Sequence, residues 1–280
     1  SKLPSINCGF LIQLNSNTLN FNLMKTVPTK VFVALATFTI SFSAFCQEKT
    51  TQAFWVHEDR VKPSMIADYE KVSKELNEAC KTYDIQTLSW ITSQTDDFRY
   101  LFVSPIDSLS DISKASKGFG VLREKMGADA FDKLFDDMDK CYDSHGDYVI
   151  VMDKSLSYMP NGITQTPEGM DYRRFYYLHT TPAGMAPLKE AIMKVKEMYE
   201  AKGSTSYYRI YRSGFGNMGS FYMVAVAAKD GTAYETQSAE NDKLLGPEAM
   251  EVFGGVMQHI TKMEEFSGRM RADLAYSPNN

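Results

Sequence analysis

The feature of this sequence that most restricts its fold is an internal repeat. The segment LSYMP at residues 156–160 recurs as LAYSP at residues 274–278, 118 residues further along the chain. Before each copy, short aromatic and β-branched runs alternate with longer runs of helical periodicity. Internal self-similarity of this kind indicates that one structural unit occurs more than once. We therefore expect two copies of a single fold in one chain.

The first copy predicts the element order β-α-β-β-α-β. Apolar residues spaced by three and four indicate its helices, whereas aromatic and β-branched runs bounded by turn residues indicate its strands. Gly146 is expected to end the second helix. The expected elements are a strand at 54–57, a helix at 63–83, strands at 87–94 and 99–106, a helix at 128–144 and a strand at 148–153.

The second copy predicts the same order. Gly203 is a favoured residue at the end of a helix, and Pro247 at the start of one. The Gly-rich segment 214–219 lies between two predicted strands, so we interpret it as a hairpin connection. A phosphate-binding loop would have to lead from a strand into a helix. The expected elements are a strand at 174–179, a helix at 183–201, strands at 206–212 and 220–228, a helix at 247–266 and a strand at 270–276.

This order is that of the ferredoxin-like split βαβ unit. A four-stranded sheet with both helices on one face leaves its other face uncovered, and two such sheets can cover each other. We therefore predict an α+β protein made of two tandem ferredoxin-like βαββαβ repeats whose sheets pack into a β-barrel with helices outside. The expected first repeat is residues 47–160, the linker 161–172 and the second repeat 173–280.

The N-terminal region predicts export. Residues 24–46 combine a basic start, an apolar stretch at 31–45 and the small-x-small sequence AFC at 44–46, which is typical of a secretory signal peptide. A membrane anchor is the alternative, but 15 apolar residues fall short of the roughly 20 that span a bilayer. Residues 1–23 are then a non-native leader upstream of the true start. We expect a periplasmic or extracellular protein without stable membrane insertion after cleavage.

The charge balance excludes one class of partner. The sequence carries a formal net charge of −5 at pH 7 and no basic run, so it lacks the electrostatic signature of nucleic-acid binding. After cleavage only Cys80 and Cys141 remain. We expect them near opposite ends of two antiparallel helices, and hence as unpaired, buried thiols.

In its repeat, its element order and its aromatic first strands, the stretch from about Ala53 to Pro278 resembles the dimeric α/β-barrel superfamily in its tandem single-chain form. This group includes NIPSNAP-type proteins, antibiotic-biosynthesis-type monooxygenases and chlorite dismutase-like haem proteins. The resemblance implies a ligand cavity between the two sheets. It also implies haem as one conceivable cofactor, with His259 as its axial ligand, although the residues themselves predict no cofactor.

Two histidines are the catalytic candidates. His57 and His179 lie near the ends of the first predicted strands of the two repeats, 122 residues apart and so close to equivalent positions. Imidazoles at the two mouths of a barrel can transfer a proton near neutral pH; the alternative is two surface residues. Of the run His57-Glu58-Asp59, only His57 and Asp59 share a strand face. Without a second histidine in register, we predict no metal site.

Aromatic and arginine side chains on predicted strands are the ligand-binding candidates. Large flat side chains with a polar tip suit a cavity for an aromatic or anionic small molecule, whose carboxylate an arginine would bind. The alternative is that aromatic residues are common strand formers and that the arginines are solvated. The candidates are Trp55, Trp90, Tyr176, Tyr208, Arg174, Arg209 and Arg212.

These observations favour an exported protein that binds a small molecule, and they leave open whether it is an enzyme and whether it forms oligomers. A cofactor-independent monooxygenase or isomerase acting in the barrel cavity is the first alternative. A haem protein similar to chlorite dismutase is the second. A barrel filled by its own side chains, with its function at an outer surface, is the third.

Overall fold

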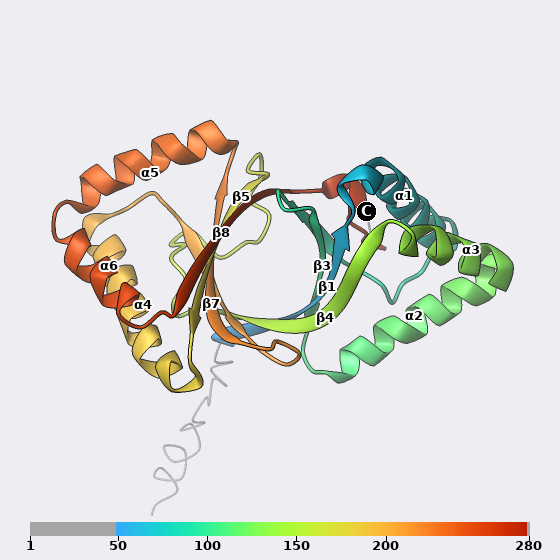
Figure 1. Ribbon diagram of the computed structural model, residues 1–280, viewed down its shortest axis with the longest axis horizontal. Helices are drawn as coiled ribbons and strands as arrows, with labels where there is room; N and C mark the ends of the chain where they lie inside the picture. Colours follow the sequence, from blue (N-terminus) through green and yellow to red (C-terminus); the bar gives the residue numbers. More distant parts are fainter. Residues whose placement is uncertain (1–48, 279–280) are drawn as a thin grey trace, which may run out of the picture. The chain divides into compact units, whose positions relative to one another are not determined.

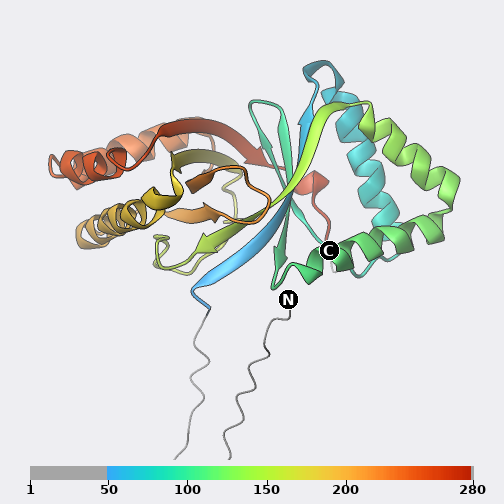
Figure 2. The same ribbon diagram turned by 60° about the horizontal axis from the view of Figure 1, so that its bottom comes forward.

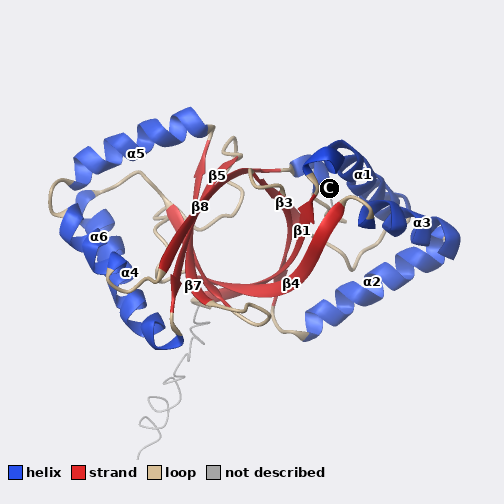
Figure 3. Ribbon diagram, in the orientation of Figure 1, coloured by secondary structure: helices blue, strands red, loops and turns tan. Residues whose placement is uncertain are grey.

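Eight strands close into a barrel in the described part of the chain, residues 49–278 of this computed structural model (Figure 1). Helices lie outside the barrel wall, on two opposite sides (Figure 3). The expected leader and signal peptide, residues 1–23 and 24–46, fall outside the described residues and stay predictions. Within 49–278 no helix is long and apolar enough to cross a membrane.

The strands of each repeat form one half of the barrel. They are β1 (Thr51–Val61), β2 (Ile91–Thr95), β3 (Arg99–Ile106), β4 (Tyr142–Asp153), β5 (Tyr172–Thr180), β6 (Tyr208–Ser213), β7 (Ser220–Ala228) and β8 (Lys262–Met270). The first half has the strand order β4-β1-β3-β2 and the second has the matching order β8-β5-β7-β6. The halves join through antiparallel pairing of β2 with β8 and of β4 with β6. This arrangement confirms the predicted fold class.

Among residues 49–278, three helices rather than the expected two cover the outer face of each half. They are α1 (Ile66–Thr82), α2 (Ser110–Met126) and α3 (Ala128–Asp139) in the first repeat, and α4 (Met185–Lys202), α5 (Gly231–Leu245) and α6 (Ala249–Met257) in the second. Short 3-10 helices η1 (Pro63–Met65) and η2 (Pro182–Gly184) precede α1 and α4, and η3 (Ala272–Leu274) follows β8. Figure 2 shows the two helical groups on either side of the strands.

The start of β4 differs from its prediction in a way that matters for the site. The helix expected at 128–144 ends at Asp139, and β4 begins at Tyr142 rather than at residue 148. Gly146 does not end a helix; it lies within β4, opposite Glu58 of β1. Pairing with the long strand β1 extends β4 over residues whose own sequence does not favour a strand.

The last helix and strand are also displaced. The helix expected at 247–266 is wrong, because α6 ends at Met257 and β8 already begins at Lys262. The strand expected at 270–276 is likewise wrong, since most of that segment forms η3 and the tail after it. Hydrogen bonding to β5 on one side and β2 on the other holds 262–270 as a strand.

A glycine permits the close approach at the junction of β2 and β8. Gly268 of β8 pairs with Thr95 of β2 on one side and with Arg173 of β5 on the other. A Cβ at this position would lie 2.3 Å from the carbonyl oxygen of Gln94. Because the two halves of the barrel meet at this pair, a residue without a side chain allows the wall to close.

The similar segments LSYMP and LAYSP each complete the core of the other repeat. Leu156 and Tyr158, which follow β4, pack in the core of the second repeat, where Tyr158 pairs with β6. Leu274 and Tyr276, which follow β8, pack in the core of the first repeat, where Tyr276 pairs with Trp90. The C-terminal tail therefore lies beside α1 (Figure 1). The two segments are alike because each fills the same place in the core of the other repeat.

Side chains fill the interior of the barrel. Apolar residues from both halves pack there, and a cavity of only about 70 Å³ remains among them. At one end the buried Arg173 and Arg209 donate hydrogen bonds to linker carbonyl oxygens, those of Gln165 and Thr164 respectively. The barrel interior itself is therefore too small for a ligand, because small-molecule sites measure roughly 300 Å³ or more. At one mouth of the barrel, residues of both halves, among them Glu58, Arg99, Tyr177 and His179, line a cavity of about 540 Å³, so the ligand cavity expected between the two sheets stays a prediction.

Candidate functional site

Each repeat has a ligand-sized cavity between its sheet and its own helices. The repeat 1 cavity measures about 430 Å³ and is lined by Trp55, His57, Asp59, Trp90, Phe102 and Phe119, with further residues of α1 to α3. The repeat 2 cavity measures about 330 Å³ and is lined by Tyr176, Leu178, Tyr208, Val226, Tyr234 and Asn241, with further residues of α4 and α6. Both volumes fall within the range of small-molecule sites.

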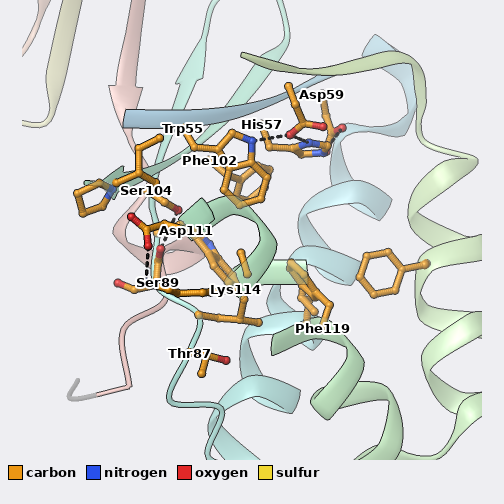
Figure 4. Close-up of a pocket in the computed structure, with 18 of the residues that line it drawn as sticks. Trp55, His57, Asp59, Thr87, Ser89, Phe102, Ser104, Asp111, Lys114 and Phe119 are labelled. Atoms are coloured by element: carbon orange, nitrogen blue, oxygen red, sulfur yellow. Dashed lines mark hydrogen bonds and ion pairs between the residues drawn. The ribbon is translucent and has the colours of Figure 1, made fainter. Parts of the chain in front are cut away.

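The alternation of β1 brings three residues with polar groups to the helix side of the wall. Trp55, His57 and Asp59 line the repeat 1 cavity, whereas Val56 between them points into the barrel. Figure 4 shows these three on the strand side of the cavity and Phe119 of α2 on the helix side. The polar groups of β1 form one end of the cavity. The rest of the wall is mostly apolar, apart from a second polar group formed by Ser89, Ser104, Asp111 and Lys114.

His57 lies between two carboxylates. Its Nε2 is 3.2 Å from Oδ1 of Asp59, and its Nδ1 is 3.0 Å from Oδ1 of Asp147 on β4. The same Asp147 oxygen accepts a 2.8 Å hydrogen bond from Nε1 of Trp55. Burial by itself would lower the pKa of His57, but the hydrogen bonds and charges of Asp59 and Asp147 outweigh it and raise that pKa to about 9.

Asp59 is the most buried member of this group, with 2 % of its side chain exposed. Its Oδ2 accepts a 2.6 Å hydrogen bond from the hydroxyl of Tyr69 on α1. Its buried Oδ1 receives no hydrogen bond of good geometry from the described residues, although His57 Nε2 is close. Burial and the neighbouring Asp59 raise the pKa of Tyr69, so its hydroxyl remains a donor. A buried acceptor without a donor is uncommon in folded proteins.

His145 joins this group through the pairing of β4 with β1. Asp59 lies directly opposite His145 in the regular register of the two strands, so their side chains share a face. The register shift between Arg60 and Val61 comes only after this pair. His145 Nδ1 lies 4.0 Å from Asp59 Oδ1, and the rings of His145 and His57 are 5.5 Å apart.

Sequence reasoning missed His145, Asp147 and Tyr69 as site residues. We expected the second helix to continue through residue 144, which placed His145 in a turn. The signal was present as the alternation of His145, Asp147 and Val149, which has the period of a strand. Gly146 within that run concealed it, because glycine commonly follows a helix.

The ligand-binding candidates do not form one site. Trp55 and Trp90 line the repeat 1 cavity, and Tyr176 and Tyr208 line the repeat 2 cavity. Arg209 lies in the barrel interior instead. The remaining two, Arg174 and Arg212, are not among the described lining residues of either cavity.

Arg174 lies on the outside of the second half, in contact with acidic and aromatic side chains. It forms ion pairs with Glu265 and, at 2.8 Å, with Glu235, and its guanidinium lies 4.7 Å from the ring centroid of Tyr234. These partners satisfy its charge, so the contacts support a structural role for Arg174 rather than the capture of an anion.

The two candidate histidines are not equivalent. Aligning η1 with η2 places Tyr176, not His179, at the position of His57, and Leu178 at that of Asp59. His179 lies at a mouth of the barrel, on the inner face of the wall, where its Nε2 is 2.6 Å from Oε2 of Glu264. His57 faces the helices, so the two imidazoles lie on opposite faces.

The repeat 2 cavity has an uncharged strand wall. The hydroxyls of Tyr176 and Tyr234 form a hydrogen bond with each other, and Asn241 donates a 3.1 Å hydrogen bond to the hydroxyl of Tyr199. The buried hydroxyl of Tyr208 has no hydrogen-bond partner among the described residues. A ligand here would meet neutral hydroxyl and amide groups.

Comparisons with known proteins bear on the fold. No model of a protein family matches the sequence, and a search of curated proteins finds no match either. Among solved structures, an anthrone oxidase-like protein has a TM-score of 0.52 at 13% identity, covering 80% of this chain and 92% of its own. A proposed monooxygenase from Lactobacillus acidophilus has a TM-score of 0.49 at 9% identity, covering 81% and 97%. A proposed chlorite dismutase has a TM-score of 0.45 at 11% identity, covering 79% and 96%.

At these identities the likeness is one of fold. The neighbours cover four fifths of the chain, which includes both repeats. Together with the closed barrel of matching halves, the likeness to the anthrone oxidase-like structure supports the fold expected from the sequence, two tandem ferredoxin-like repeats whose sheets close into one barrel.

Proposed function

We propose that the protein binds a small aromatic or otherwise apolar molecule in the repeat 1 cavity, with Trp55, His57 and Asp147 orienting its polar end. The observation that carries this proposal is a cavity of about 430 Å³ with mostly apolar walls and a polar end formed by Trp55, His57 and Asp147. Apolar walls favour binding by removing ligand surface from water, at about 25 cal/mol per Å². A few fixed polar groups then select the orientation.

The charges at the polar end narrow the ligand class. Asp59 and Asp147 flank His57, so this end carries excess negative charge and disfavours a carboxylate. Lys114 also lines the cavity, but it is ion-paired with Asp111. We therefore propose a neutral ligand, or one whose polar end donates hydrogen bonds, instead of an anion.

His57 supports a binding role better than proton abstraction. With its pKa raised to about 9, the ring of His57 carries a proton at neutral pH, whereas a general base must be unprotonated at the working pH. This disfavours the oxygenase or isomerase alternative with His57 as its base. His259, the expected haem ligand, is not among the described lining residues of either cavity.

The two tryptophans of the sequence provide the test, because both Trp55 and Trp90 line the repeat 1 cavity. The neutral aromatic probe N-phenyl-1-naphthylamine should bind the purified full chain and accept energy from their emission. Ala115→Phe should weaken this binding at least tenfold by filling space in the repeat 1 cavity. The matched control Ser238→Phe fills the repeat 2 cavity and should leave the energy transfer unchanged.

Circular dichroism would confirm that both variants are folded. Unchanged probe affinity in folded Ala115→Phe would contradict the proposal. Loss of affinity in Ser238→Phe alone would move the binding site to the second repeat.

A further inference from the structure

We propose that the first repeat also binds a divalent transition-metal ion, through Nε2 of His57, Oδ1 of Asp59 and Nδ1 of His145. These three atoms all lie within 4.8 Å of one another, and they are the only such group of three among the described residues. The proposed site lies at the polar end of the repeat 1 cavity. It does not require that an organic ligand bind there.

The distances suit a first-row metal ion after a small adjustment. Asp59 Oδ1 lies 3.2 Å from His57 Nε2 and 4.0 Å from His145 Nδ1. Bonds of about 2.0–2.2 Å to one ion require ligand atoms roughly 3–3.5 Å apart, so the His145 ring must move inward by about 1 Å. With 56 % of its side chain exposed, His145 has room for that movement.

Two neighbours hold the ligands as metal sites commonly require. The hydroxyl of Tyr69 bonds to Oδ2 of Asp59, which leaves Oδ1 free to point at the ion. Oδ1 of Asp147 accepts a hydrogen bond from Nδ1 of His57. The ion would displace the other ring proton of His57, and Nε2 would then be the ligand atom. A metal-binding histidine usually donates its other ring nitrogen to a carboxylate in this way.

The second repeat shows that the fold itself does not need these polar groups. Where the first repeat pairs Asp59 with His145, the second pairs Leu178 with Met263. The position of Tyr69 on α1 corresponds to Leu188 on α4. Asp59, His145 and Tyr69 of the first repeat thus have apolar counterparts in the second. Oδ1 of Asp59 receives no hydrogen bond of good geometry, although His57 Nε2 lies at 3.2 Å, and this is explained if the oxygen serves a ligand.

The donor set identifies the class of ion. Two imidazole nitrogens and one carboxylate oxygen suit Zn²⁺, Fe²⁺ and related divalent ions rather than Ca²⁺ or Mg²⁺, which prefer oxygen ligands. Three protein ligands leave further coordination positions open. Since His57 and Asp59 line the repeat 1 cavity, an open position would face a molecule bound there.

The experiment titrates the full chain, freed of metal by a chelator, with Zn²⁺ against a chromophoric competitor. Co²⁺ absorption then reports the coordination of the ion. We expect one ion per chain, and a loss of affinity of at least tenfold in His145→Gln, Asp59→Asn and His57→Gln. Asp147→Asn should weaken binding by about 10- to 100-fold through the orientation of His57. The matched control is His259→Gln, which removes a histidine outside the site.

His145→Gln decides the outcome, because this residue is exposed and its substitution does not threaten the fold. The proposal is overturned if the wild type binds no Zn²⁺ at micromolar concentrations, if His145→Gln binds as tightly as the wild type, or if His259→Gln loses affinity equally. Mg²⁺ titrated in the same way should not displace Zn²⁺ from the site.

Discussion

The two repeats form a cavity in the same place, between a four-stranded sheet and three helices, yet they line it with different chemistry. In the first repeat the outward positions of the central strand carry Trp55, His57 and Asp59, and in the second the aligned positions carry Arg174, Tyr176 and Leu178. One cavity wall is charged at one end. Arg174 is not among the described lining residues of the second cavity, whose strand wall presents neutral hydroxyl groups and apolar side chains.

This difference separates what the fold requires from what has been added to it. Leu178 and Met263 pack as neighbours in the second repeat, so apolar residues satisfy these positions. Asp59 and His145 therefore place polar groups at positions where the same fold also accepts apolar side chains. Function is carried by sites placed on a fold. The second repeat shows which residues occupy the same positions when the polar group of the first repeat is absent.

We expect the largest effect on stability at the two reciprocal tails, residues 156–160 and 274–278, each of which packs in the core of the other repeat. Tyr276→Ala removes a buried ring whose hydroxyl donates to the carbonyl oxygens of Cys80 and Ile85, and it should lower the free energy of unfolding by about 3–5 kcal/mol. Tyr158→Ala should destabilise the chain similarly. Only Tyr276→Ala should alter tryptophan emission in the folded state, because Tyr276 packs 5.2 Å from Trp90.

Chemical denaturation and emission spectra of the two tyrosine variants would measure this. If Tyr158→Ala changed the tryptophan emission of the folded chain as much as Tyr276→Ala, each tail would not serve the opposite repeat as described.

An exchange between matched positions should have the next largest effect. Leu178→Asn places a buried amide where the second repeat offers apolar neighbours, and should lower stability by about 2–3 kcal/mol. The reverse change is the double variant Asp59→Leu/Tyr69→Phe, which removes the carboxylate together with the buried hydroxyl that donates to it. It should alter stability by about 1 kcal/mol or less in metal-free buffer, because no buried donor is left without its acceptor.

Thermal or urea unfolding of both variants in the presence of a chelator is the measurement. A loss in the double variant as large as that in Leu178→Asn would show that the first repeat needs its carboxylate for folding, and the contrast between the repeats would then fail.

A smaller effect should distinguish the two tails. Acid should weaken the attachment of the C-terminal tail and not that of the other. Hydrogen bonds from Arg271 lower the pKa of Glu70 and of Asp273, and so they join the C-terminal tail to α1. Both pKa values are depressed, so this stabilisation is complete above the unfolded-state pKa of about 4 and is lost as the pH falls below it. After allowance for partial exposure we expect a loss of about 1–2 kcal/mol. Before the other tail, Asp153 stands at the position of Arg271 and bonds to Ser155 instead.

The measurement is the unfolding free energy between pH 5 and about pH 2.5. Arg271→Gln should flatten the acid-dependent part of the curve, whereas Arg123→Gln, which removes an exposed pair with Asp132, should not change its shape. An unchanged curve in Arg271→Gln would contradict the assignment.

Local pattern and duplication were enough to predict the barrel, because its strands carry their own signals. The run Ser220–Ala228 is aromatic and β-branched, and it forms β7 with the bounds expected. The helices α2 and α5 were not predicted. Their sequences are rich in serine, lysine and polar residues, with few apolar positions to mark a buried face.

The candidate site was predicted in part. His57, Trp55 and Trp90 do meet at one cavity, because β1 was recognised and its alternation is regular. His145 could not be placed, since its direction depends on pairing with a strand more than 80 residues away. Such non-local pairing decides which residues share a face, and local propensity does not contain it.

The reciprocal tails also set an order in time. A chain leaves the ribosome from its N-terminus, so Leu156 and Tyr158 are available before the strands of the second repeat exist. The first repeat is made early, yet its core stays open until Leu274 and Tyr276, which follow the last strand of the second repeat, have been added. The half that is synthesised first is therefore the half that is completed last. During that interval its unfilled apolar surface is the part of the nascent chain that most needs protection from aggregation.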